Sequence, residues 1–108
     1  VDGKIVLIDG GIEADLLRES VEWGRRHAKN SHGVDVIGEF SVAMNPNAQI
    51  IGHTLIDEKT KGTSHVAIGS NTWFGGQNKA NIHFDNVYKD PTVVVDGIPL
   101  MEKGVFKI

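Results

Sequence analysis

Only one long segment of this sequence, residues 12–29, has the periodicity of an α-helix, and this limits the folds that the chain can adopt. Apolar or small side chains recur near helical spacing at Leu16, Leu17, Val21, Gly24 and Ala28. Acidic residues begin the segment and basic residues end it, which is the arrangement that the helix dipole favours. We therefore predict one main helix, with the rest of the fold built from other elements.

The remaining chain consists mostly of short extended segments separated by turn residues. These segments cover residues 4–8, 34–44, 64–69, 81–85, 92–95, 98–101 and 105–108. Asp96-Gly97 joins two of them and is the strongest hairpin signal in the chain, whereas residues 57–62 suit a single helical turn. Because most connections are short, adjacent strands should be mainly antiparallel. The sequence predicts an α+β fold in which one main helix packs on a mixed, mostly antiparallel β-sheet.

Composition excludes several classes of function. The chain has 108 residues, enough for one small domain, and its net charge of -3 includes no basic stripe for nucleic acid. It has no cysteine, which excludes a disulfide framework, a thiolate metal site and a cysteine nucleophile. Its apolar runs are far shorter than the roughly 20 residues that span a bilayer. We expect a cytoplasmic protein with no nucleic-acid or membrane partner, in which any metal is held by His, Asp, Glu or Tyr.

His83 and Asp85 form the most informative local pattern. Residues two apart on a strand point to the same face, so an imidazole and a carboxylate would converge there. Two such side chains suit one metal ion, although a His–Asp pair on the surface fits the same pattern. His65 precedes an apolar stretch, and its imidazole would be either a metal ligand or a core histidine bonded to a backbone carbonyl.

Glu39 lies within an otherwise apolar strand, on the face opposite Phe40. A carboxylate there is costly unless it is paired, protonated or bound to a cation, and the alternative is an exposed residue of an edge strand. Asp57 and Glu58 would be a helix-capping carboxylate and a general base, respectively, or two ordinary acids at a helix start. No site is assigned to the other histidines, His27, His32 and His53. Two His, one Asp and one isolated Glu match the ligands of Zn²⁺, Mn²⁺, Co²⁺ or Fe²⁺ in hydrolytic or oxygen-using sites.

The order of these motifs resembles the C-terminal half of the thermophilic aminopeptidases T and S, which are leucyl aminopeptidase-like metalloproteases. The segments that carry the resemblance are Gly38–Ala48, Asp57–Lys59, Gly62–Gly69, Phe74–Gly76, Ile82–Asp85 and Val95–Gly97. The match runs from about Gly3 to the end of the chain. The resemblance implies a metal-dependent hydrolase that removes N-terminal residues from a peptide substrate, and we also expect a homodimer.

In that family a pair of divalent metals activates a water molecule for attack on the N-terminal peptide bond. The expected metal is Zn²⁺, Co²⁺ or Mn²⁺. Carried over to this chain, the resemblance implies that Glu58 is the catalytic base and that the metal ligands are Glu39, His65, His83 and Asp85.

Residues 1–108 are expected to be the C-terminal metal-binding domain of a longer two-domain protein. The chain begins at Val1 without an initiator Met, in what resembles a strand. A further glutamate ligand of the family lies upstream of the motif that contains Glu39, before the start of this chain. The resemblance therefore implies an incomplete site and an inactive isolated chain.

Two alternatives remain open. Thr72 and Trp73 stand where the family has a tyrosine, which favours one metal over two. A branch of the superfamily resembles the dihydroxypyridine dioxygenases, in which one Fe²⁺ held by His and carboxylate groups activates O₂ and opens an aromatic ring. The second alternative is a non-catalytic dimerisation or structural module, since exposed strand edges would favour self-association.

Overall fold

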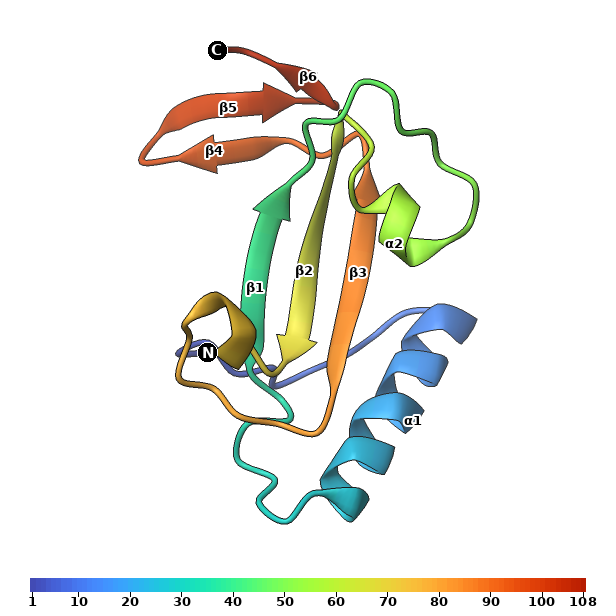
Figure 1. Ribbon diagram of the computed structural model, residues 1–108, viewed down its shortest axis with the longest axis vertical. Helices are drawn as coiled ribbons and strands as arrows, with labels where there is room; N and C mark the ends of the chain where they lie inside the picture. Colours follow the sequence, from blue (N-terminus) through green and yellow to red (C-terminus); the bar gives the residue numbers. More distant parts are fainter. The chain divides into compact units, whose positions relative to one another are not determined.

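The computed structural model describes all 108 residues, Val1–Ile108. Its elements, in chain order, are the helix α1 (Ile12–His27), β1 (Ile37–Val42), the short helix α2 (Thr54–Asp57), β2 (Thr63–Gly69), the 3-10 turn η1 (Thr72–Phe74), β3 (His83–Lys89), β4 (Val93–Val95), β5 (Ile98–Glu102) and β6 (Val105–Phe106) (Figure 1). The strands form two three-stranded sheets, in the orders β1-β2-β3 and β4-β5-β6, and neighbouring strands run in opposite directions. One main helix with antiparallel sheets confirms the predicted α+β class. None of the helices has the length and apolar character that a membrane span requires.

The chain divides into two compact units. Unit 1 comprises residues 1–39 and 67–84, and unit 2 comprises residues 40–66 and 85–108. The helix α1 and the turn η1 belong to unit 1, whereas α2 and the sheet β4-β5-β6 belong to unit 2. Each strand of the first sheet has residues in both units.

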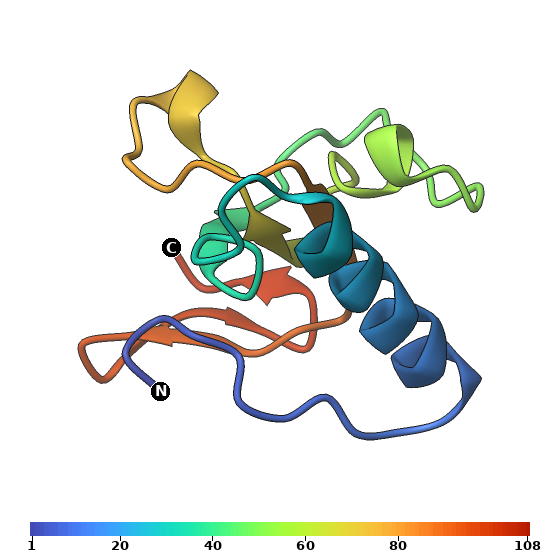
Figure 2. The same cartoon turned by 90° about the horizontal axis from the view of Figure 1, so that it is seen from below.

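The core of unit 1 forms where α1 packs against the end of β2 and the start of β3. Val21 of α1 is buried there together with Val34, Ile68 and Ile82. Gly24 allows the close approach, because a Cβ atom at this position would lie 2.9 Å from Ile82 Cγ2. Figures 1 and 2 show η1 on the opposite side of unit 1 from α1. The predicted helix is therefore confirmed, and it ends two residues earlier than expected, at His27.

The predicted strand over residues 4–8 is wrong. Lys4 forms an isolated bridge with Val36, supported by a 2.8 Å hydrogen bond from the Ile5 amide to the Asp35 carbonyl, but residues 5–8 are not in a strand. Val6 and Leu7 are 74% and 77% exposed. An apolar, β-branched sequence favours an extended backbone, but a ladder also requires a neighbouring strand along the whole segment.

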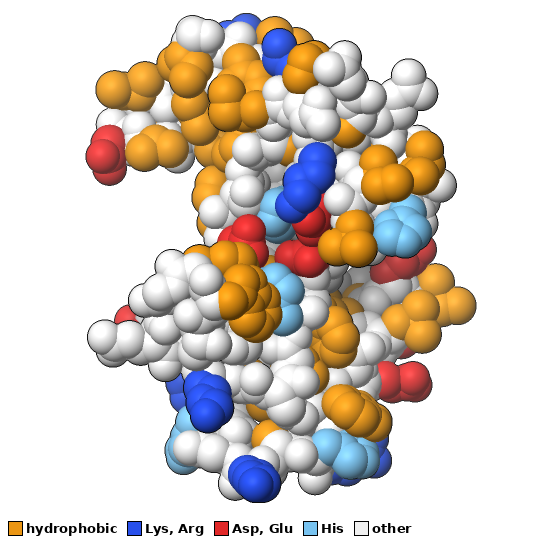
Figure 3. All heavy atoms as spheres, viewed as in Figure 1, with side chains coloured by type: hydrophobic (Ala, Val, Ile, Leu, Met, Phe, Trp, Pro, Cys, Tyr) orange, Lys and Arg blue, Asp and Glu red, His pale blue; other side chains and the backbone are white.

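The hairpins of unit 2 form at the turn residues that the sequence indicates. Asp96 and Gly97, between β4 and β5, both have positive φ angles, 51° and 79°, as a two-residue hairpin turn requires. Lys103 and Gly104 repeat this arrangement between β5 and β6, with φ angles of 47° and 76°. Figure 3 shows hydrophobic side chains gathered over this sheet. Its strands also carry four exposed apolar residues, Val94, Val95, Ile98 and Val105. The expected homodimer stays a prediction.

The boundaries of the other elements differ from the predicted ones. The strand β1 covers residues 37–42 within the predicted 34–44, and β3 extends to Lys89, four residues beyond the predicted end. The short helix lies at residues 54–57 instead of 57–62. Asp57 ends that helix, and its Oδ1 atom accepts a 2.8 Å hydrogen bond from the Ile51 amide, which gives this carboxylate a structural role.

Candidate metal centre

Side chains that can ligate a metal gather in each unit. In unit 1, Glu39 of β1 and His83 of β3 lie together, with Oε2 of Glu39 3.5 Å from Nε2 of His83. In unit 2, Glu58, His65 and Asp85 form a group whose ligand atoms all lie within 4.8 Å of one another. All five residues belong to the set that the sequence singled out.

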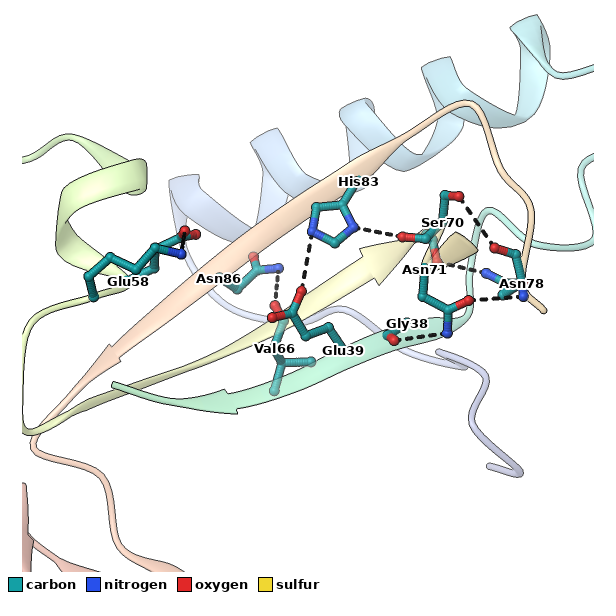
Figure 4. A network of polar contacts seen from close by, with 11 residues as sticks. Gly38, Glu39, Glu58, Val66, Ser70, Asn71, Asn78, His83 and Asn86 are labelled. Atoms are coloured by element: carbon teal, nitrogen blue, oxygen red, sulfur yellow. Dashed lines mark hydrogen bonds and ion pairs between the residues drawn. The ribbon is translucent and has the colours of Figure 1, made fainter. Parts of the chain in front are cut away.

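The imidazole of His83 is held at both ring nitrogens. Its Nδ1 atom lies 2.7 Å from the carbonyl oxygen of Ser70, and its Nε2 atom lies 3.5 Å from Oε2 of Glu39, as Figure 4 shows. A carbonyl oxygen only accepts hydrogen bonds, so Nδ1 carries the proton and donates it. In the neutral ring Nε2 then presents a lone pair toward the Glu39 side. A backbone contact of this type is what fixes the tautomer and orientation of metal-ligating histidines.

Two asparagines hold the backbone around this pair. Asn71 donates through Nδ2 to the carbonyl of Gly38, the residue before Glu39, at 3.0 Å. Asn78 donates through Nδ2 to the carbonyls of Gly33 and Gly69, at 2.9 Å and 2.7 Å. Sequence reasoning missed both asparagines, since their partners lie on distant segments. The glycine-rich loop around them was the only sequence signal of a braced turn.

The group in unit 2 is more deeply buried. Glu58 and His65 are 6% and 3% exposed, and Asp85 is half-buried. Glu58 directly follows α2, where its amide donates to the carbonyl of Thr54 at 3.0 Å. His65 lies on β2 and Asp85 on the neighbouring strand β3. Asn86, next to Asp85, donates through Nδ2 to the carbonyl of Val66 at 3.2 Å.

The surroundings of Glu58 favour its charged form. Burial alone raises the pKa of Glu58, but hydrogen bonds to Lys59 and Asp85 and the charges of Lys59 and His65 outweigh it and hold the pKa below its ordinary value. Two neighbouring carboxylates repel each other unless a proton or a cation lies between them. One imidazole and two carboxylates in a buried group are ligands typical of a divalent transition metal, so the donor set fits a metal ion.

The structure therefore sorts the predicted site residues into two groups. Glu39 pairs with His83, and His65 lies beside Asp85 together with Glu58, which had been predicted as the base. His83 and Asp85 are two residues apart on β3, so strand alternation directs their side chains to one face of that strand. That all four predicted ligands bind a common metal stays a prediction. The histidines without an assigned role lie outside both groups, and His27 stacks on Trp23 at 4.4 Å.

The fold resembles that of a solved oxygenase. The structure of 2,5-dihydroxypyridine dioxygenase from Pseudomonas putida KT2440 is similar, with a TM-score of 0.78 and 24% sequence identity. The similarity covers 96% of this chain and 31% of the dioxygenase chain, so the chain spans about a third of that protein's length. No protein-family model and no curated protein sequence matches the chain. At this identity the likeness shows the fold.

This comparison contradicts the predicted relationship to aminopeptidases T and S, and with it the assignment of the chain as a metallo-aminopeptidase and hydrolase. The motifs behind that assignment are ligand positions and glycine turns. A His-x-Asp pair and a half-buried glutamate suit a metal that serves hydrolysis or oxygen chemistry equally well, so they do not select the reaction. The solved protein whose fold the chain shares is of the kind named in the dihydroxypyridine dioxygenase alternative.

Proposed function

We propose that this chain is the metal-binding part of a ring-cleaving dioxygenase that acts on a dihydroxylated pyridine or a closely related aromatic ring. The observation that carries the proposal is the buried group of Glu58, His65 and Asp85, an imidazole with two carboxylates in a fold shared with a dihydroxypyridine dioxygenase. The donor chemistry supports a resident metal, and the fold supports the type of reaction. Activity and substrate of the whole protein are part of the proposal.

The proposed ligand set contains two imidazoles and carboxylates, with no sulfur. We propose that the four ligands predicted from the sequence, Glu39, His65, His83 and Asp85, hold this metal. Two histidines with a carboxylate are typical of non-haem Fe²⁺ oxygenases, and such sites keep open positions for other ligands. We therefore propose one Fe²⁺ ion per chain in place of the metal pair first predicted.

An Fe²⁺ ion in such a set supplies the redox chemistry that O₂ needs to react with an aromatic ring. The protein supplies orientation and charge. The Ser70 carbonyl holds His83 in one tautomer, so that Nε2 is the atom available for coordination. The lowered pKa keeps Glu58 ionised at neutral pH, which suits binding a cation better than storing a proton. We therefore propose that Glu58 contributes a ligand oxygen or compensating charge rather than acting as the predicted base.

Metal stoichiometry and oxygen uptake test the proposal. The chain, freed of metal by a chelator, is titrated without oxygen with Fe²⁺ and, in parallel, with Co²⁺, whose visible spectrum reports coordination. We expect one equivalent to bind, and 2,5-dihydroxypyridine to change the Co²⁺ spectrum. The Fe²⁺ form of the whole protein that contains this chain, mixed with the same compound and O₂, should consume one O₂ for each ring lost, whereas its Zn²⁺ form should consume none. Failure to bind a metal, or binding of two equivalents, would overturn the proposal.

A further inference from the structure

The turn η1 presents two aromatic rings beside a proposed metal ligand. Trp73 and Phe74 are 60% and 54% exposed, although burial of such rings is favourable. Their ring centroids lie 5.1 Å apart with planes at 65°, and the Trp73 ring lies edge-on to His83 at 4.6 Å. Phe74 also contacts His83, at 5.9 Å. The three rings form one aromatic cluster that keeps a large surface open to solvent.

The backbone of this turn is fixed rather than loosely exposed. Both the Phe74 amide and the Gly76 amide donate to the Asn71 carbonyl, at 3.2 Å and 3.0 Å. Gly75 adopts a left-handed φ of 87°, which closes the turn. The Asn71 side chain accepts from the Asn78 amide at 3.0 Å and donates to the Gly38 carbonyl. The position of Trp73 is therefore tied to β1 at the residue next to Glu39.

The same cluster also fixes the ring of His83. The Ser70 carbonyl and Glu39 contact the two nitrogens of the imidazole, and Trp73 packs against its ring. A flat molecule resting on the exposed indole surface would thus be held beside a ring whose own orientation is set by three neighbours. Aromatic faces carry a negative quadrupole, so the indole favours an offset-stacked or edge-on flat ring and disfavours an anionic group over its face.

We propose that Trp73, supported by Phe74, is the specificity-determining platform on which the heteroaromatic ring of the substrate stacks next to His83. The proposed substrate class rests on the function proposed above, whereas the platform itself rests on the geometry of η1. Stacked rings typically contribute enough to change an affinity by about three- to tenfold beyond the area they bury. The platform accounts for the exposed aromatic pair in a braced turn.

The chain contains two tryptophans, which allows a matched experiment. Trp23 is also half-exposed and stacked on a histidine, but it lies on α1, on the opposite side of unit 1 from η1 (Figures 1 and 2). The variant Trp23→Phe retains Trp73 as its sole tryptophan, and Trp73→Phe retains Trp23. Each Zn²⁺-loaded variant is titrated with 2,5-dihydroxypyridine while tryptophan fluorescence is followed. We expect saturable quenching in Trp23→Phe and no specific quenching in Trp73→Phe.

Calorimetry completes the test. Trp73→Ala should bind the pyridine about tenfold or more weakly, Trp73→Phe should stay within about threefold of wild type, and Trp23→Ala should be unchanged. Metal affinity should be the same in all of these variants. If Trp73→Ala is poorly folded by circular dichroism, Trp73→Leu replaces it. Equal affinity for the pyridine in wild type and in Trp73→Ala or Trp73→Leu, or the absence of quenching in Trp23→Phe, would overturn the platform.

The two proposals fail in different ways. Loss of O₂ consumption in the Fe²⁺ protein, with ring binding to Trp73 intact, would overturn the dioxygenase function alone. Metal binding and O₂ consumption that persist without any effect of Trp73→Ala on ring affinity would overturn the platform alone. A saturated diol of similar size, cyclohexane-1,4-diol, serves as the ring control, and binding of this diol as tightly as the pyridine would also contradict stacking.

Discussion

The Nε2 atom of His83 lies 3.5 Å from the Glu39 carboxylate, while the Nδ1 atom of the same ring lies 2.7 Å from the Ser70 carbonyl. The contact at Nδ1 is made by a backbone carbonyl, which substitution of Ser70 would not remove. The contact at Nε2 is made by the side chain of Glu39, which substitution can remove. The geometry therefore leaves Nε2 as the ring nitrogen that faces a metal. Substituting His83 and Glu39 separately would measure what the imidazole and the carboxylate each contribute to metal binding.

Replacing His83 by Ala should abolish high-affinity metal binding, because Nε2 is the proposed ligand atom. We expect the dissociation constant for Co²⁺ to rise by more than about 100-fold, beyond the 10- to 100-fold loss typical of groups that only orient a ligand. Isothermal titration calorimetry measures this, with His32→Ala as the control at an exposed histidine outside both groups. Unchanged metal affinity in His83→Ala would remove His83 from the ligand set.

The α+β class and the hairpins were predictable because their signals are local. The helix α1 is specified by periodicity and charge within 16 residues, and the β4–β5 turn by two adjacent residues, Asp96 and Gly97. The strand predicted at residues 4–8 failed because pairing depends on distant segments. The same limit applies to β3 beyond its predicted end at Asp85, where Asn86 donates to the carbonyl of Val66, 20 residues away.

The candidate ligand residues were predictable from the sequence, but the residues that hold the backbone around them were not. Glu39 was identified because a carboxylate inside an apolar strand is unusual, and His83 and Asp85 because of their two-residue spacing. The braces Asn71 and Asn78 were missed since they bond to backbone carbonyls 33 and 45 residues away. The reaction type was also mispredicted, because the same ligands serve hydrolases and oxygenases.

Substitutions in the unit 2 group should be non-additive. His65→Ala and Asp85→Asn should each weaken Co²⁺ binding. The double variant should bind Co²⁺ only slightly more weakly than the single variant with the lower affinity, because both substitutions remove ligands of the same ion. Calorimetric titration of the four proteins gives the coupling free energy. Asp57→Asn is the control, since this carboxylate bonds to the Ile51 amide and lies outside the group. Fully additive losses would argue that His65 and Asp85 do not share a metal.

The stability of the metal-free protein should depend on pH through Glu58. The folded-state pKa of Glu58 is lowered below its ordinary value of 4.5, so its stabilisation is fully present above that pH and is lost as the pH falls toward the folded-state pKa. Urea unfolding of wild type and Glu58→Gln should therefore differ most near neutral pH and converge in acid. In a Lys59→Met background the difference should shrink, since Lys59 is one of the groups that lower the pKa. A stability difference between wild type and Glu58→Gln that grows in acid would contradict a lowered pKa of Glu58.

Gly69 should be the least replaceable glycine near the site, because both its backbone and its surroundings exclude a side chain. Its φ angle is 107°, and a Cβ atom would lie 2.2 Å from the Ile82 carbonyl oxygen. Its own carbonyl accepts the bond from Asn78, and Ser70, the next residue, holds His83. We expect Gly69→Ala to destabilise the fold by about 3 kcal/mol or more.

The matched control is Gly52→Ala, because Gly52 has a similarly positive φ of 83° but no atom within 4 Å of the added Cβ. That variant should lose only the cost of the left-handed backbone, about 1–2 kcal/mol. Urea unfolding measures both variants, and the difference between them isolates the clash with Ile82. Equal losses would mean that the backbone at Gly69 moves to accept a methyl group. Such a movement would also shift Ser70, whose carbonyl contacts His83. If the metal affinity of Gly69→Ala then matched that of wild type, the position of His83 would not depend on a fixed Ser70.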